Sequence, residues 1–122
     1  MWHQPAFSSS VPGDVPGSLP LWQAVVAGGA DVVLNGHRHQ YERFTTMDAA
    51  GAPNAAGTRE IVVGTGGDDL EAFGAIKPTS EARVQAFGVL QLQLGPTGYT
   101  LRFVGTDGVV LDQADGTCHA TP

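Results

Sequence analysis

Basic residues, cysteine and long apolar runs are all scarce in this sequence. Its 122 residues include six Lys and Arg against twelve Asp and Glu, for a formal net charge of −6. No basic surface is therefore expected for a phosphodiester backbone, which excludes nucleic acid as the expected partner. The apolar runs are shorter than the roughly 18 to 20 residues that cross a bilayer, so no membrane partner is expected. Cys118 is the one cysteine, which excludes an internal disulfide.

Glycine and proline, in contrast, are abundant. The chain holds 17 Gly and 8 Pro, while 42% of its residues are hydrophobic and 15% are charged. This composition is typical of a globular chain with many turns, and it favours strands over long helices. At this length we expect a single domain.

The first half of the sequence predicts one helix among loops and apolar strands. Residues 1–17 are rich in Ser, Pro and Gly and are expected to form a loop. Residues 18–29, "SLPLWQAVVAGG", combine an N-cap candidate, an early proline, apolar residues at helical spacing and a Gly-Gly stop, which predicts a helix. The apolar run "ADVVLNG" at 30–36 predicts a central strand covered on both faces. Further strands are predicted at 40–48 and from residue 59 into a glycine-rich turn, with a loop at 49–58 between them.

The second half of the sequence predicts an antiparallel meander. Residues 70–86 contain no clear pattern and are expected to form a loop. Residues 87–94 and 99–104 alternate apolar and polar side chains around a "GPTG" turn, and "TDG" then predicts a tight turn into a third strand at 109–113. The predicted fold class is therefore α/β and β-rich, with one main helix and a C-terminal antiparallel β-meander.

Two histidines follow the first predicted strand, in "GHRHQYER" at residues 36–43. In an extended segment, residues two apart project to the same side, so His37 and His39 are placed to approach one point or two neighbouring points. Neutral imidazole is a common ligand for zinc and iron, which makes the pair a candidate metal site. The alternative is a solvent-exposed pair in a turn, because two ligands alone do not hold a metal.

The wider pattern around the histidines resembles a known family. Gly36, His37, His39 and the run "YER" at 41–43 match a Gly-His-x-His-x-Tyr-Glu-Arg motif, and "HQP" at 3–5 matches a His-x-Pro motif. The sequence resembles the C-terminal half of a calcineurin-like metallophosphoesterase, of the purple acid phosphatase-like branch, over nearly the whole chain. The resemblance implies that residues 1–122 form half of an αββα sandwich whose N-terminal half is absent.

The resemblance also implies a metal site and an activity. His3 and His37 would bind one metal ion and His39 its neighbour, with the ions drawn from Fe, Zn or Mn. Two such ions about 3.5 to 4 Å apart activate water for hydrolysis of a phosphate ester, the implied substrate. The family's carboxylate and Gly-Asn-His motifs are not in this sequence, so three histidines cannot reproduce the two-metal centre and the isolated chain is expected to show little activity.

Residues beside the histidines have both a functional and a structural interpretation. Arg38 is a candidate phosphate contact, although a solvent-facing position is favoured. Asn35 is either a hydrogen-bond partner next to the metal ligands or the end of a strand. Tyr41, Glu42 and Arg43 are interpreted as supporting residues, with a Glu–Arg pair orienting the histidine loop.

Three further groups have plainer interpretations. Gly64, Gly66 and Gly67 are expected to form a turn, although they could also bring backbone close to a substrate. The acidic residues Asp68, Asp69 and Glu71 are expected to be solvated or to substitute as ligands. The tail "TCHATP" at 117–122 is expected to be disordered at His119, with a Cys118–His119 metal site as the alternative.

A second function class is a non-catalytic, self-associating β-rich module. Half of a sandwich exposes an apolar sheet face and unpaired strand edges, which a partner or another copy of the chain typically covers. We therefore expect a homo-oligomer, or a partner that supplies the missing N-terminal half. In this class the histidines bind a single metal or none. Members of the resembled family are often exported, which suggests an extracytoplasmic location without determining it.

Overall fold

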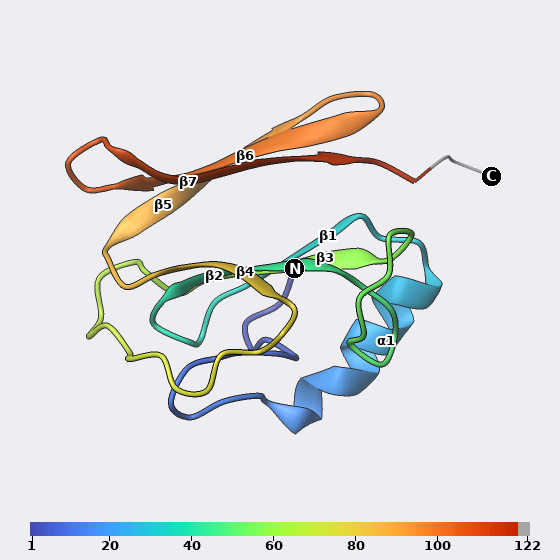
Figure 1. Cartoon of the computed structure of the whole chain (residues 1–122), viewed down its shortest axis with the longest axis horizontal. Coiled ribbons are helices and arrows are strands. Elements are labelled where there is room, and N and C mark those ends of the chain that lie inside the picture. Colours follow the sequence, from blue (N-terminus) through green and yellow to red (C-terminus); the bar gives the residue numbers. More distant parts are fainter. Residues whose placement is uncertain (120–122) are drawn as a thin grey trace.

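Two β-sheets and one α-helix make up residues 1–119, the part of the chain that the computed structural model describes. Figure 1 shows three layers, with a three-stranded sheet, a four-stranded sheet below it, and a third layer of helix and N-terminal loop. This arrangement confirms the predicted β-rich α/β class. The elements are η1 (Pro16–Ser18), α1 (Leu19–Ala27), β1 (Val32–Asn35), β2 (Tyr41–Met47), β3 (Thr58–Val63), β4 (Ser80–Val84), β5 (Gly88–Leu94), β6 (Gly98–Gly105) and β7 (Val110–Thr117).

The two sheets differ in strand direction. The four-stranded sheet has the order β1-β3-β2-β4, in which β1 and β3 are parallel and the other pairs are antiparallel. The three-stranded sheet β5-β6-β7 is antiparallel throughout, so the predicted meander is confirmed. Its turns follow the sequence signals, with the "GPTG" and "TDG" segments between successive strands.

Helix α1 begins after Ser18, carries a proline in its first turn and ends at a glycine pair, as its sequence predicts. Gly29 has φ +72°, a backbone conformation that glycine adopts without steric cost. Trp22 is fully buried between the helix and the four-stranded sheet, and its Nε1 donates to the Asp48 carbonyl at 3.0 Å. No helix among residues 1–119 has the length and apolar content to span a bilayer.

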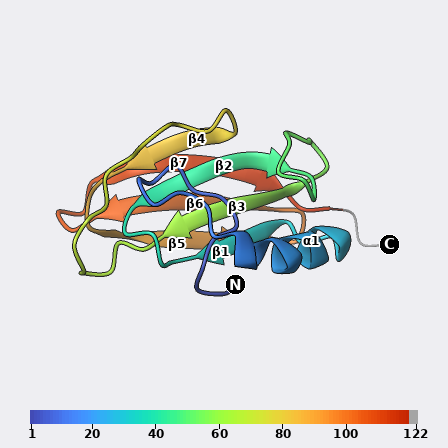
Figure 2. The ribbon, with the colours of Figure 1, turned by 90° about the horizontal axis from the view of Figure 1, so that it is seen from below.

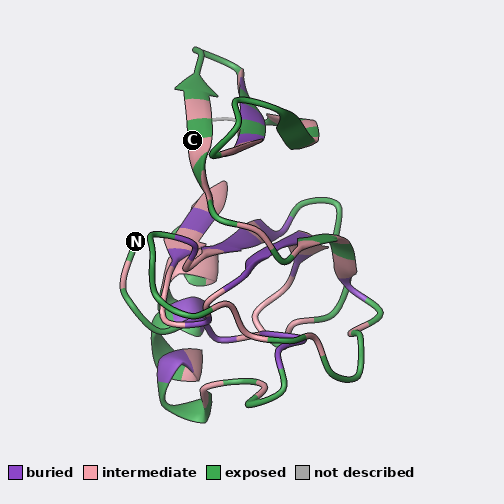
Figure 3. Cartoon of the chain, turned by 90° about the vertical axis from the view of Figure 1, so that its left-hand side faces the viewer, coloured by how far each residue is buried: buried purple, intermediate pink, exposed green. Residues whose placement is uncertain are grey.

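A second core fills the space between the two sheets. Tyr41 of β2 stacks on Phe103 of β6, with ring centroids 4.2 Å apart, and Leu101 lies fully buried beside them. Inward residues of β6 alternate with exposed Thr100 and Arg102, so one face of the meander is buried as its pattern predicts. Figure 3 shows the buried positions gathered in the middle layer, between the helix and the outer sheet.

Three sequence-based expectations are wrong. Residues 80–84 form strand β4, although the sequence predicts a loop there. The segment "SEARV" has few apolar residues and shows no strand pattern of its own, and it gains its conformation by pairing with β2. β1 is an edge strand and not a central one. Its run of apolar residues reflects coverage on both faces, since Val33 packs in the core on the helix side and Leu34 packs between the sheets. Leu94, which the alternation in residues 87–94 groups with the partly buried Leu90 and Leu92, is instead 72% exposed at the end of β5.

Both sheets leave an edge strand unpaired on the same side of the molecule. β1 and β5 are these edges, and Figure 2 shows them running along one side. Leu34 and Val63 from one sheet and Leu90 from the other line a groove of about 530 Å³ between the edges. Within residues 1–119, no strand pairs with either free edge.

Candidate metal centre

The histidine loop starts where β1 ends. His37 lies two residues past Asn35 and has φ 65°, a left-handed backbone conformation that non-glycine residues rarely adopt. Such strain is maintained only where the surrounding contacts determine it, and it often accompanies a functional position. The conformation turns the chain directly after the strand, so that the imidazole of His37 faces the N-terminal segment.

His3 and His37 form the closest histidine pair. His3 Nε2 lies 3.2 Å from His37 Nδ1, and the rings meet edge to face with centroids 5.0 Å apart. Two imidazole nitrogens bound to one tetrahedral zinc at about 2.0 to 2.1 Å lie roughly 3.3 Å apart, so this pair fits two positions of one ion. Burial, followed by the charges of Arg38 and His3, holds the pKa of His37 below its ordinary value. The low pKa favours the neutral imidazole that a metal requires.

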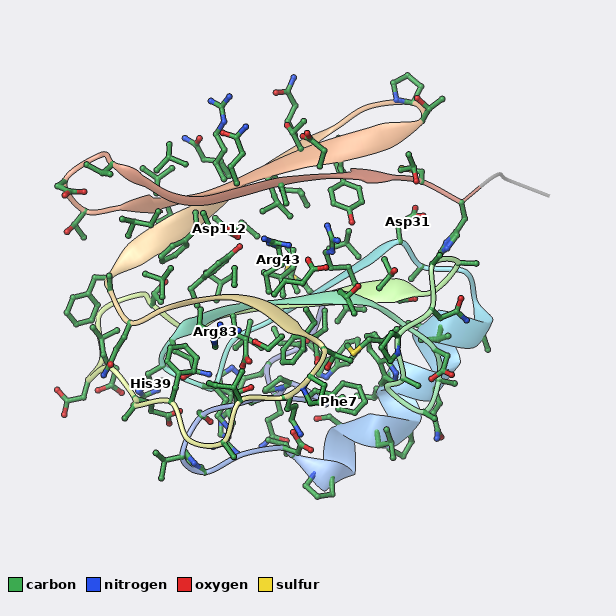
Figure 4. The ribbon with its side chains drawn as sticks, viewed as in Figure 1. Phe7, Asp31, His39, Arg43, Arg83 and Asp112 are labelled. Carbon is green, nitrogen blue, oxygen red and sulfur yellow. The ribbon has the colours of Figure 1, made fainter. Side chains whose placement is uncertain are left out.

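His39 points to a different set of groups. Its Nδ1 lies 2.8 Å from the Asp69 carbonyl oxygen, which fixes the proton on Nδ1 and leaves Nε2 available. That Nε2 lies 3.9 Å from a carboxylate oxygen of Asp68, a member of the acidic group. Figure 4 shows His39 on the loop side of the middle sheet, away from the space between the sheets.

Residues 1–119 bring His3 and His37 together as a pair and leave His39 apart from them. No group of three or more His, Cys, Asp or Glu side chains within residues 1–119 is arranged to hold a metal ion. The predicted division of His3 and His37 on one ion from His39 on another agrees with this separation but stays a prediction. The donor set fits part of one ion's coordination.

Asn35 connects β1 to the segment that carries His3. Its Nδ2 donates to the Trp2 carbonyl at 2.9 Å and to the Gln4 carbonyl at 3.3 Å. The backbone N–H of Gly36 donates to the His3 carbonyl at 2.9 Å. Asn35 is thus both the last residue of β1 and a hydrogen-bond donor to the segment around His3, while its role next to metal ligands stays a prediction.

Arg38 does not face solvent, contrary to the favoured expectation. Its side chain is 9% exposed, and Nε donates to the Gly13 carbonyl at 2.9 Å. The loop of residues 1–17 covers it, which could not be read from a polar residue between two histidines. The phosphate contact suggested for Arg38 stays a prediction.

The expected Glu42–Arg43 pair is not formed, because neighbouring residues of a strand point to opposite faces. Glu42 is fully buried on the loop side, where its Oε2 accepts from the Ser9 N–H at 2.8 Å and its Oε1 from the Ser80 hydroxyl at 2.6 Å. Arg43 points between the sheets, where Nε donates to Asp112 at 2.8 Å. Tyr41 shares that direction, and Figure 4 shows Arg43 and Asp112 between the sheets.

Glu60 is a residue whose importance the sequence did not indicate. It is fully buried in β3, and its two carboxylate oxygens accept from the backbone N–H groups of Ala6 and Phe7 at 2.8 and 3.0 Å. Burial raises the pKa of Glu60 to about 8, against the two hydrogen bonds, which lower it. One sequence feature could have indicated it: Glu60 is an acid inside the apolar run "REIVV", where a buried charge is costly unless it has a partner.

The glycine turn and the tail also have defined places. A Cβ on Gly64 would lie 2.0 Å from the Arg38 carbonyl oxygen, so this glycine packs directly against the histidine loop. His119 is held, contrary to the expected disorder, because its N–H donates to Asp31 and its Nδ1 lies 3.1 Å from the same carboxylate. Residues 120–122 of the predicted tail lie outside the described residues.

Comparison with known proteins gives structural matches only. Neither a protein-family model nor a curated protein matches the sequence. Purple acid phosphatase PPD1 from yellow lupin (Lupinus luteus) seeds matches with a TM-score of 0.76 and 26% identity over 93% of this chain and 23% of that chain. GAP50, the anchor in the inner membrane complex of Plasmodium, matches with a TM-score of 0.78 and 20% identity over 97% of this chain and 35% of that chain.

These matches cover nearly all of this chain but a small part of the other two. The chain spans 23% of the length of the purple acid phosphatase and 35% of the length of GAP50. The shared part includes most of both sheets, since the matches extend over 93% and 97% of the chain. The motif of residues 36–43 and the two structural matches together show that this chain has part of the purple acid phosphatase-like metallophosphoesterase fold.

Proposed function

We propose that this chain supplies the histidine side of a dinuclear metal site in a phosphoesterase. His3 and His37 are the proposed ligands of one ion and His39 of the other, with Fe, Zn or Mn as the metal. A bound ion pair would activate water and stabilise the transition state of phosphate ester hydrolysis. The chain's own contribution is to hold the neutral imidazoles in place.

The observation that carries the proposal is the approach of His3 and His37. Their facing nitrogens are 3.2 Å apart at the carboxyl end of β1, on a fold shared with a purple acid phosphatase. A single hydrogen bond between the two rings is the plain alternative. It leaves unexplained the left-handed backbone at His37, which has φ 65° and costs about 1 kcal/mol or more.

Hydrolysis requires ligands beyond these residues, and we propose that another polypeptide segment supplies them. Carboxylates are the family's bridging ligands, but no third acidic or histidine ligand joins His3 and His37 within residues 1–119. The open edges of β1 and β5, and the apolar groove between them, offer the place where such a segment would complete the fold. The phosphate ester substrate belongs to the completed protein.

Metal titration tests the proposal. Isothermal titration of the chain with Zn²⁺ or Mn²⁺ is expected to show binding that His37→Ala weakens at least about tenfold. His119→Ala is the matched control, because His119 bonds to Asp31 on a different part of the surface and its loss should leave the affinity unchanged. Equal binding by wild type and His37→Ala would reject the proposed site.

An activity assay addresses the need for completion. We expect little turnover of an aryl phosphate by the chain with added Mn, Fe or Zn. Robust turnover that disappears in His37→Ala would show that the chain is a complete catalyst, against the proposal that another segment supplies ligands.

A second candidate function is a non-catalytic, self-associating module. The free edges of β1 and β5 favour it, as do exposed apolar side chains near them, Val89 at 62% and Leu94 at 72%. GAP50, which shares the fold, is an anchor in a membrane complex, so a binding role suits this architecture. Sedimentation at micromolar concentration is expected to show a homo-oligomer, and a strictly monomeric species would count against this function.

A further inference from the structure

The side chain of Asn35 holds the chain on both sides of His3. One carboxamide nitrogen, Nδ2, donates to the carbonyls of Trp2 and Gln4, the residues that flank the histidine. Next to it, the Gly36 N–H donates to the carbonyl of His3 itself. Three consecutive carbonyls of an N-terminal segment are thus bound by two consecutive residues at the end of β1.

The same carboxamide is only half satisfied. Asn35 is 5% exposed, and its Oδ1 is buried without a hydrogen-bond partner among residues 1–119. A buried acceptor without a partner costs about 1 to 3 kcal/mol. A leucine of similar size would avoid that cost but would lose both hydrogen bonds that Nδ2 donates on either side of His3, so these two bonds account for an asparagine here.

We propose that Asn35 is a positioning residue for His3, which holds the His3 imidazole against His37 in the geometry of a shared metal ion. This inference rests on the proposed function and extends it to a residue outside the ligand set. The two rings come from segments 34 residues apart in the chain. Their contact at 3.2 Å therefore depends on the bonds that tie the segment around His3 to β1.

Removal of Nδ2 leaves the segment with fewer bonds to the strand. The bond from Gly36 to the His3 carbonyl would remain, and Trp2 would still pack against the helix-side core, but neither contact involves the His3 side chain. The Ser18 hydroxyl still donates to the Gln4 carbonyl, from the helix side and not from β1. His3 is exposed, so no packing core would keep its ring facing His37 once these bonds are lost.

The first test requires no metal. In the wild-type chain, nuclear Overhauser contacts between the imidazole protons of His3 and His37 are expected, since the ring centroids are 5.0 Å apart. Asn35→Leu should remove these contacts. Val33→Ala is the matched control, because Val33 is 2% exposed in the same strand and faces the same core, yet makes no polar contact with the N-terminal segment.

The second test measures metal affinity and stability together. Asn35→Leu is expected to weaken Zn²⁺ binding by about 10- to 100-fold, as substitutions beside metal ligands do. Val33→Ala should lower the melting temperature more than Asn35→Leu while leaving the Zn²⁺ affinity within a factor of about two. If the loss of Zn²⁺ affinity instead follows the loss of melting temperature across all variants, Asn35 is merely structural.

A double-mutant cycle separates this inference from the proposed function. In a His3→Ala background, Asn35→Leu should cause no further loss of Zn²⁺ affinity, because the group that it positions is gone. A full additional loss in that background would overturn the positioning role. If His37→Ala weakens Zn²⁺ binding but Asn35→Leu does not, this inference fails and the metal site stands. If neither change affects Zn²⁺ binding, the proposed function fails. Persistent contacts between the His3 and His37 rings in Asn35→Leu would reject the inference independently of metal.

Discussion

Arg43 of β2 reaches across the space between the sheets to Asp112 of β7, with Nε 2.8 Å from Oδ2 and side chains only 11% and 12% exposed. The Tyr41 hydroxyl donates to the same oxygen at 2.6 Å, and Glu81 of β4 also pairs with Arg43. Burial acts to raise the pKa of Asp112, but the hydrogen bonds from Arg43 and Tyr41 outweigh it and hold that pKa below its ordinary value. This cluster is a polar connection between the two sheets, and Arg59 of β3 adds to it by pairing with Glu81.

Removal of the carboxylate is expected to destabilise the chain. Asp112→Ala leaves the Tyr41 hydroxyl without its acceptor and the Arg43 cation with Glu81 as its remaining partner, in a largely buried position, at a cost of roughly 3 kcal/mol. Chemical denaturation at pH 7 measures this change. Asp115→Ala on the same strand is the control, because Asp115 is exposed and its loss should change stability by less than about 0.5 kcal/mol.

The same carboxylate predicts a loss of stability in acid. Because the pKa of Asp112 is lowered in the folded chain, its stabilising effect is complete above the unfolded-state pKa of about 3.9 and is lost as the pH falls through the folded-state value. Denaturation midpoints measured from pH 6 down to pH 2 should therefore fall more steeply for wild type than for Asp112→Ala. Parallel curves for the two chains would contradict the assignment.

Glu60 predicts a pH effect of the opposite sign. Its folded-state pKa of about 8 lies above the usual value of 4.5, so the folded chain binds this proton more tightly than the unfolded chain. The contribution to stability is largest below pH 4.5, decreases as the pH rises towards 8 and is constant above it. Glu60→Gln should flatten the stability profile between pH 5 and 8, whereas Asp68→Asn, at a carboxylate 78% exposed, should leave the slope unchanged.

Two substitutions at His37 separate metal binding from backbone strain. Both His37→Gly and His37→Ala remove the proposed ligand, so each should abolish the high-affinity phase of a Zn²⁺ titration. Glycine tolerates the φ of 65° and alanine does not, so the glycine variant should be the more stable by about 1 kcal/mol in denaturant. Equal stability would mean that this backbone conformation is not maintained in solution.

Two glycines beside the site test how closely it is packed. Gly64→Ala should lower stability by roughly 1 to 3 kcal/mol and weaken Zn²⁺ binding, since its Cβ would collide with the Arg38 carbonyl and displace the histidine loop. Gly66→Ala is the matched control, because nothing lies within 4 Å of its added Cβ. A thermal melt and a Zn²⁺ titration of each variant compare them, and identical behaviour would show that the loop yields without cost.

Local patterns in the sequence predicted the meander and the helix. The alternation in β6 and the turn segments on either side of it involve residues that are neighbours in sequence. These patterns can therefore be recognised without knowing which strands pair. β4 could not be predicted in this way, because its conformation depends on the edge of β2 some 40 residues earlier. The edge position of β1 was hidden for a related reason, since coverage by two layers produces the same apolar run as a central position.

The sequence by itself determined which residues are the candidate metal ligands of this chain. His37 and His39 follow an apolar strand, and the spacing within "GHRHQYER" was sufficient to identify the family resemblance. Only the tertiary structure decided that Asn35 bonds to the residues on both sides of His3 and that the N-terminal loop covers Arg38. It also decided that Glu42 and Arg43 point to opposite faces of β2. The physical reason is that hydrogen-bond partners of these groups lie far away in sequence, and only the stacking of two sheets and a loop brings them within reach.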